Sequence, residues 1–129
     1  MLENFYDISD LETDAKFFDA FLYSNNFIFN KYGNEVYDIE NKQSFQLSTT
    51  DNNGFIIAAN NENGKISLVY EYNEEYIYVV FEKKDGTYQP TKQEKIMLNI
   101  DEINSEIIFK DFKSLLYVNF RNEIIEVAL

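Results

Sequence analysis

The sequence contains neither histidine nor cysteine. Without cysteine the chain forms no disulfide and has no thiolate nucleophile and no cysteine-based metal site. Without histidine it has no Ser–His–Asp triad, no imidazole general base and no imidazole ligand for zinc. These absences exclude the commonest enzyme chemistries. We therefore interpret the chain as a binding protein that is not an enzyme and needs no cofactor or metal.

Positive charge is scarce as well. Eleven Lys and Arg residues face 23 Asp and Glu residues, which gives a net charge of −12, and Arg121 is the single arginine. Such a surface repels nucleic-acid phosphates and anionic lipid, and it attracts basic proteins. The charge favours a basic protein partner over nucleic acid or a membrane. Solubility of a chain rich in aromatic residues is the simpler alternative explanation.

Long apolar runs are missing. The longest are Phe27–Phe29, Phe55–Ala59 and Ile77–Phe81, far short of the roughly 20 residues of a membrane-spanning helix. Met1 to Asp10 lack the basic and apolar regions of a signal peptide. We expect a cytoplasmic protein. The excess of Asn, Ile, Lys, Phe and Tyr over Ala, Arg, Gly and Pro indicates an AT-rich coding sequence, as in a low-GC bacterium or its phage.

Apolar residues are plentiful enough for a core. The 129 residues are 45% hydrophobic and include 12 Phe and 10 Tyr, with only four Gly and one Pro. A chain of this length fits one domain, and such a domain buries roughly two thirds of the surface of its unfolded chain. We find no internal repeat and no linker, so a single domain over residues 1–129 is predicted.

The N-terminal segment has the pattern of a helix. Ser9 and Glu12 form a capping-box pair at its start. Apolar residues then recur at helical spacing at Leu11, Ala15, Phe18 and Leu22. Asn25-Asn26 would end this helix, because Asn tolerates the left-handed conformation of a C-terminal cap.

From Phe27 onward the apolar period changes to two, which is typical of strands. Turn residues such as Asp51-Asn52-Asn53-Gly54 and Asp85-Gly86 separate short alternating segments. The pattern predicts an antiparallel meander with strands at Phe27–Tyr32, Glu35–Glu40, Ser44–Thr49, Phe55–Asn60, Lys65–Tyr72, Tyr76–Lys83 and Thr87–Gln89.

The C-terminal third supports two interpretations. Thr91 and Glu94 form a second capping-box pattern, so Lys92–Leu98 can open a short helix, or Lys95–Ile100 can be a strand. Residues 101–120 fit a helix, although Ile107–Phe112 and Leu115–Phe120 also resemble strands. We favour a helix there, followed by a strand at Ile124–Leu129. The expected fold class is α+β, with a meander of about five to six strands packed against an N-terminal and a C-terminal helix.

No motif for catalysis or ligand binding stands out. The chain has no phosphate-binding glycine loop, and Asp51-Asn52-Asn53-Gly54 fails as a calcium loop because Phe55 and Ala58 occupy ligand positions. Pairs of carboxylates can hydrolyse glycosides or bind Mg²⁺ and Ca²⁺, but with this many acids a solvated surface explains the clusters more simply.

Mixtures of tyrosine and carboxylate are the best candidates for a binding surface. Tyrosine buries a large area while its hydroxyl finds a partner, and nearby carboxylates attract a basic protein. The candidate partner-binding residues are Glu71, Tyr72, Glu74, Glu75, Tyr76 and Tyr78 on one predicted hairpin, and Tyr37, Asp38 and Glu40 on another strand. The alternative is that Tyr72, Tyr76 and Tyr78 belong to the core face, together with Ile66, Leu68 and Tyr70.

A small acidic chain without catalytic residues is similar in general character to the immunity proteins that bacteria pair with toxins, although no motif carries the similarity. Our hypothesis is an immunity protein that neutralises a bacterial toxin, a nuclease in particular, by blocking its active or substrate-binding site. The alternatives are a phage-encoded inhibitor that mimics nucleic acid, a self-associating structural subunit, and a carboxylate-based enzyme.

Overall fold

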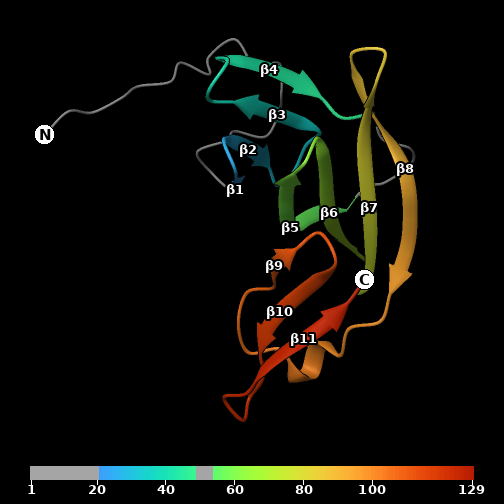
Figure 1. Ribbon diagram of the computed structural model, residues 1–129. Helices are drawn as coiled ribbons and strands as arrows, with labels where there is room; N and C mark the ends of the chain where they lie inside the picture. Colours follow the sequence, from blue (N-terminus) through green and yellow to red (C-terminus); the bar gives the residue numbers. More distant parts are fainter. Residues whose placement is uncertain (1–20, 49–53) are drawn as a thin grey trace, which may run out of the picture.

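Strands make up almost all of the computed structural model, which describes residues 21–48 and 54–129 (Figure 1). The elements run in the order β1 (Phe21–Ser24), β2 (Phe27–Asn30), β3 (Glu35–Asp38), β4 (Gln43–Gln46), β5 (Phe55–Glu62), β6 (Lys65–Tyr72), β7 (Glu75–Lys84), β8 (Thr87–Ile96), the 3₁₀ turn η1 (Ile100–Glu102), β9 (Ile108–Asp111), β10 (Ser114–Val118) and β11 (Ile124–Ala128).

The strands form three antiparallel sheets, and neighbours in each sheet are also neighbours in the chain. The N-terminal sheet has the order β1-β2-β3-β4, the central sheet β5-β6-β7-β8, and the C-terminal sheet β11-β10-β9. Figure 1 shows the N-terminal sheet beside the upper part of the long strand β7 and the C-terminal sheet beside its lower end. The predicted antiparallel pairing is confirmed, but the single meander of about five to six strands is wrong, because the strands form three separate sheets.

Two-residue turns with positive φ angles connect the long hairpins. The φ angles are 52° and 75° in Asn63-Gly64, and 52° and 80° in Asp85-Gly86. Two successive left-handed residues are what a type I′ hairpin turn requires, and Asn-Gly and Asp-Gly adopt it most readily. Asn73-Glu74, with φ angles of 50° and 64°, connects β6 to β7 in the same way. Local sequence therefore determines where these strands end.

The two middle strands of the central sheet are buried on both faces. On β6, Ile66, Leu68 and Tyr70 face the N-terminal sheet, whereas Val69 faces the C-terminal sheet. On β7, Val79 and Phe81 lie on the first face, and Tyr76, Tyr78 and Val80 lie on the second. Side chains alternate across a strand, so both alternating sets here need to be apolar.

Apart from Tyr70, the buried core facing the N-terminal sheet is made of hydrocarbon side chains. Phe29 and Val36 from that sheet pack against Ile66, Leu68 and Phe81, and each of these side chains is at most 1% exposed. Full burial of one such side chain contributes about 1.5–3 kcal/mol. This interface fixes the N-terminal sheet against the central one.

The core facing the C-terminal sheet contains more tyrosine. Leu115 and Tyr117 from β10 pack against Val69, Tyr76 and Tyr78. The Tyr78 hydroxyl lies 3.1 Å from the backbone carbonyl oxygen of Phe112 and donates a hydrogen bond to it. The hydroxyl thus ties the central sheet to the turn between β9 and β10.

The predicted α+β class with an N-terminal helix is wrong. The end of that predicted helix is strand β1, which pairs with β2 so that Leu22 lies opposite Phe29. Asn25 and Asn26 have φ angles of 43° and 71° and form the turn of a hairpin instead of a helix cap. The left-handed preference of Asn serves either structure. Residues 9–20 of the predicted helix lie outside the described residues.

The predicted helix in the C-terminal third is also wrong. Thr91 and Glu94 lie inside β8, and the Thr91 hydroxyl donates to the backbone oxygen of Val80 at 3.4 Å instead of capping a helix. The stretch 101–120 contains β9 and β10, and the described residues include no α-helix, only the 3₁₀ turn η1. The strand predicted at Ile124–Leu129 is confirmed as β11. Pairing with β11 and β9 on its two sides stabilises β10 as a strand.

Candidate functional site

The sequence-predicted binding residues divide between the two ends of the central sheet. Glu71, Tyr72, Glu74 and Glu75 surround the β6–β7 turn, whereas Asp38 and Glu40 lie by the β3–β4 turn, close to the β5–β6 and β7–β8 turns. The strand β6 between these ends spans about 23 Å at the usual rise of roughly 3.3 Å per residue. The structure therefore does not bring the two groups together.

Three of the predicted tyrosines are core residues. Tyr37, Tyr76 and Tyr78 are 6%, 4% and 3% exposed, so none of their rings can cover a partner. Tyr72 is 42% exposed and remains available at the β6–β7 turn. Tyr76 and Tyr78 do pack in the core, as the alternative interpretation held, but on the face opposite to that of Ile66, Leu68 and Tyr70.

The β6–β7 turn is an acidic tip, and its Glu71 also lines a cavity beside β5. Glu74 is exposed and occupies the left-handed position that glycine takes in the two neighbouring hairpin turns. Glu75 is already paired, because Lys95 Nζ lies 2.6 Å from its Oε1. Surface ion pairs of this kind contribute about 0–1 kcal/mol. Within residues 21–48 and 54–129, Glu71 and Glu74 form no ion pair and thus supply the unpaired charge of this tip.

A polar groove at the other end of the sheet is better shaped for binding. Its volume is about 550 Å³, and it lies where four turns meet. We call it the Asp38 groove. Its walls come from the β1–β2 turn at Asn25-Asn26, the β3–β4 turn at Asp38, Glu40 and Asn41, the β5–β6 turn at Asn63-Gly64, and the β7–β8 hairpin at Lys83, Gly86 and Tyr88.

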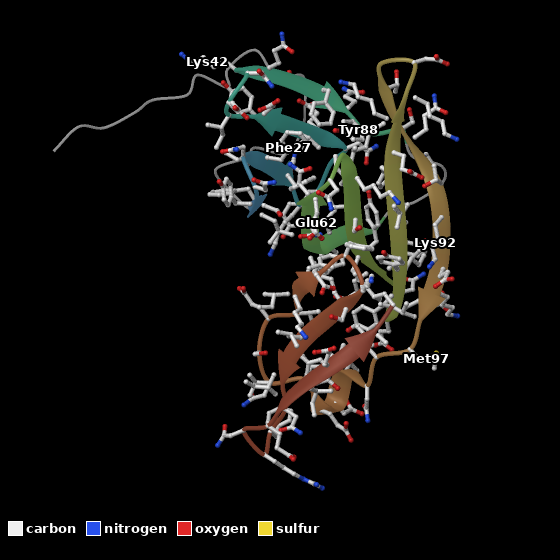
Figure 2. The ribbon with its side chains drawn as sticks, viewed as in Figure 1. Phe27, Lys42, Glu62, Tyr88, Lys92 and Met97 are labelled. Carbon is white, nitrogen blue, oxygen red and sulfur yellow. The ribbon has the colours of Figure 1, made fainter. Side chains whose placement is uncertain are left out.

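Aromatic rings form the inner surface of the Asp38 groove. The rings of Phe45 and Tyr88 are stacked, with centroids 5.1 Å apart and planes inclined by 22°. Phe27 packs edge-on against both, at centroid distances of 5.4 Å from Phe45 and 6.5 Å from Tyr88. Figure 2 shows Phe27 and Tyr88 close together between the N-terminal sheet and β8. These contacts give the groove a rigid apolar floor beneath polar walls.

Charged groups sit directly on this floor. Lys83 Nζ lies 6.0 Å from the centroid of the Tyr88 ring, a position that allows a cation–π interaction. Burial raises the pKa of the Tyr88 hydroxyl, and the negative charge of Asp38 raises it further. Tyr88 therefore stays neutral well above physiological pH and offers its ring and a hydroxyl rather than a negative charge.

Amide side chains hold the walls in place. The Asn25 side chain donates to the backbone oxygen of Asn61 at 3.3 Å, and the Asn61 side chain donates to the backbone oxygen of Asn25 at 2.9 Å. In the β3–β4 turn, Asp38 Oδ2 accepts a hydrogen bond from Asn41 Nδ2 at 2.7 Å. The first pair joins two sheets, so the groove is a feature of their packing.

Sequence reasoning identified Asp38 and Glu40 but missed most of the groove. Lys83 and Tyr88 lie opposite each other on the β7–β8 hairpin, whereas Phe45 comes from β4, and no spacing in the sequence connects Phe45 with that hairpin. The Asn-rich turns were visible in the sequence, but they were interpreted only as turns. Their side chains converge because the N-terminal sheet packs against the central one.

A second cavity, of about 450 Å³, lies beside the edge strand β5. Apolar side chains such as Leu22, Ile57 and Ile107 line much of it, together with Glu71 and Tyr76. Burial raises the pKa of Tyr76, and the nearby charges of Glu71 and Glu74 add to this rise. Glu106, Tyr23 and Lys31 also line this cavity, so it offers both donors and acceptors of hydrogen bonds.

Comparisons with known protein families, curated proteins and solved structures found no match to this chain. Within residues 21–48 and 54–129, no three acidic side chains gather closely enough to hold a metal ion. The same residues contain no helix with the length and apolar character to span a membrane.

Proposed function

We propose that this chain is a small acidic inhibitor, an immunity protein that binds a basic bacterial toxin, most simply a nuclease, and covers its active or substrate-binding site. The Asp38 groove is the observation that carries the proposal. It combines a hollow, two carboxylates and an aromatic floor in a chain with a net charge of −12. Nuclease surfaces that bind phosphate groups are basic and fit such a surface.

The groove suits a Lys or Arg side chain of the partner. Asp38 and Glu40 supply carboxylates at the wall, and the Tyr88 ring supplies a face on which a cation can rest, as Lys83 Nζ does at 6.0 Å. A partner's guanidinium would replace Lys83 on this ring and pair with the carboxylates. Cation–π contacts and desolvated charge pairs are among the stronger contributions at protein interfaces.

The acidic β6–β7 tip has a different role in this proposal. Its charges lie about 23 Å along the sheet from the groove, by the usual strand rise, so they attract a basic partner at long range without sharing the groove. Long-range attraction raises association rates and is weakened by salt. Lys substitutions at Glu71, Glu74 and Glu75 should therefore slow association without destroying the bound complex.

The test compares two variants with equal loss of charge. One carries Asp38→Asn and Glu40→Gln in the groove, and the other carries Glu71→Gln and Glu74→Gly at the tip. Glycine suits the left-handed position of Glu74 (φ 64°). Each tagged chain is used as bait in extracts of the source organism, with quantitative mass spectrometry, and the captured protein is assayed for nuclease activity.

We expect wild type and the tip variant to retain one basic protein in near-equal amount and to suppress its activity. The groove variant should bind at least tenfold more weakly. Truncating a residue at the centre of an interface typically costs more than about 1.4 kcal/mol of binding free energy, which corresponds to a factor of ten. Equal capture by both variants would reject the groove as the binding site. Capture of no basic protein by wild type would reject the inhibitor proposal.

A further inference from the structure

The edges of the three sheets are protected to different degrees. An edge strand presents unpaired backbone groups, which proteins cover or block with Pro, Lys or bulges. On β5, the backbone N–H of Asn61 donates to Ser24 Oγ of β1 at 2.9 Å, so the neighbouring sheet covers this edge. On β8, a bulge at the Val80/Phe81 pairing adjoins Pro90, and Lys92 and Lys95 follow.

The edge of β11 has no such protection in the described part of the chain. Among the described strands, it pairs with β10 alone. Residues Ile124–Ala128 contain no Pro, Gly or Lys, and their pairing with β10 shows no bulge. Isoleucine and valine are strong strand formers. This edge is therefore open to a further strand.

The hydrogen bonds of the ladder show which groups point outward. The Asn119 backbone N–H donates to Glu123 O at 3.0 Å, and the Leu129 N–H donates to Lys113 O at 2.7 Å. Paired backbone groups alternate along an antiparallel strand, so Ile125 and Val127 also face β10. The N–H and C=O groups of Ile124, Glu126 and Ala128 consequently point away from the sheet.

Side chains beside this edge are apolar and exposed. The outer face of the C-terminal sheet carries Ile108, Leu116, Val118 and Ile124, because Leu116 lies opposite Ile108 and Val118 opposite Ile124. Ile124 is 74% exposed and Ile108 is 53% exposed. Glu126 is the one charged residue of β11, and it accepts a hydrogen bond from Lys110 at 2.9 Å.

We propose that the open edge of β11 binds an extended segment of another protein as an added antiparallel strand, with a basic residue opposite Glu126 and apolar residues on either side. Backbone bonds at Ile124, Glu126 and Ala128 supply the pairing, and the apolar outer face selects alternate side chains. This site lies apart from the Asp38 groove and does not depend on the groove being used.

Charge selects a basic partner over a second copy of the chain. A two-fold antiparallel pairing that uses all three outward residues places Glu126 directly opposite its own copy, and like charges in that position are destabilising. Two chains of charge −12 also repel each other at a distance. A Lys or Arg on the added strand reverses both effects.

The probe is the capped peptide Val-Thr-Lys-Thr-Val, titrated at up to millimolar concentration into the full chain labelled with ¹⁵N. We expect amide exchange at Ile124, Glu126 and Ala128 to slow as the peptide binds, whereas Ile125 and Val127 change little because they are already bonded to β10. The peptide with Glu in place of Lys should bind about fivefold more weakly. Unchanged exchange at the three outward amides would overturn the proposal.

Two variants separate an added strand from a non-specific contact. Glu126→Pro removes an outward N–H and leaves the bonds of Ile125 and Val127 to β10, and edge strands tolerate Pro in this orientation. Glu126→Lys should reverse the preference, so that the Glu peptide binds better than the Lys peptide. Binding unaffected by Glu126→Pro would overturn strand addition.

Sedimentation of the full chain without peptide tests whether two copies of the chain pair through β11. We expect a monomer, because of the repulsion at Glu126. A dimer that dissociates in the Glu126→Pro variant would overturn the choice of a basic partner in favour of a second copy. Failure of the groove variants described above would leave all of these results unchanged, so the two proposals stand or fall separately.

Discussion

The two faces of the central sheet are both buried, but tyrosine is used differently on each. Facing the N-terminal sheet, the Tyr70 ring is 2% exposed and its hydroxyl has no hydrogen-bond partner within residues 21–48 and 54–129. Facing the C-terminal sheet, the Tyr78 ring is equally buried, but its hydroxyl bonds to Phe112 O. Within the described residues, the buried tyrosine hydroxyl on one face has no bond, whereas on the other face it forms a directed bond to a turn.

The largest effect should come from the hydrocarbon face. Phe29→Ala removes a fully buried ring (0% exposed) and should lower the free energy of unfolding by about 4 kcal/mol, from lost burial and the cavity that remains. Urea denaturation followed by circular dichroism measures this change. Phe120→Ala, at a ring that is 64% exposed, is the matched control and should change stability by less than about 0.5 kcal/mol. Equal losses would contradict the assigned core.

The directed bond on the other face should be worth less. Tyr78→Phe keeps the ring and removes the hydroxyl, which leaves Phe112 O without this donor, so we expect a loss of about 1–1.5 kcal/mol. Thermal unfolding measures it. Hydrogen exchange should also become faster in the β9–β10 turn than in the N-terminal sheet. A uniform increase across both sheets would argue against a local tie.

The same substitution should have the opposite sign at Tyr70. Tyr70→Phe removes a buried hydroxyl that lacks a partner in the described residues, so we expect a gain of about 1 kcal/mol. The comparison with Tyr78→Phe has the same chemical change in both arms. A loss of stability at Tyr70 would show that its hydroxyl has a bonding partner in the folded protein.

The buried Tyr70 hydroxyl should also make the free energy of unfolding depend on pH. Burial raises the pKa of Tyr70 above its ordinary value of 10.0, so the unfolded chain ionises first. Ionisation of Tyr70 leaves the free energy of unfolding unchanged below about pH 10 and lowers it as pH rises from there toward the folded-state pKa, by up to about 1.4 kcal/mol per pH unit. Tyr70→Phe should therefore lose less stability than wild type in alkaline urea titrations.

The smallest effect should come from the surface of the C-terminal sheet. Lys110 and Glu126 form an exposed pair, and the hydrogen bond between them raises the pKa of Lys110, with their mutual attraction as a second cause. Glu126→Gln should change the free energy of unfolding by less than about 0.5 kcal/mol. A larger loss would mean that β11 depends on this pair, which would complicate the strand-addition variants.

Local sequence was sufficient for most strands but not for the first one. Lys65–Tyr72 was predicted with the observed bounds, because its period of two and the turns around it leave one solution. Phe21–Ser24 was assigned to a helix, because Leu11, Ala15, Phe18 and Leu22 match a helical period. The Asn25-Asn26 pair can end a helix or turn a hairpin, so pairing with β2 decides between them.

The candidate site was predicted only in part, for a similar reason. Asp38 and Glu40 were found because acid and tyrosine lie together on one short stretch. Phe45 and Tyr88 were not found, since their stacking joins two hairpins that are far apart in the sequence. The same limit explains why Tyr76 and Tyr78 were placed on a binding surface: one strand alone does not show that its second face is also covered.

The sequence by itself determined the absence of histidine and cysteine chemistry, the charge of −12, and the hairpin turns at Asn63-Gly64 and Asp85-Gly86. These follow from composition and from conformational preferences of neighbouring residues, which act over a few positions. Tertiary structure decided that β8 continues to Ile96 through a polar stretch, that β6 and β7 are covered on both faces, and that four turns converge on the Asp38 groove. Those features depend on contacts between distant segments, and their free energy arises only when the three sheets pack together.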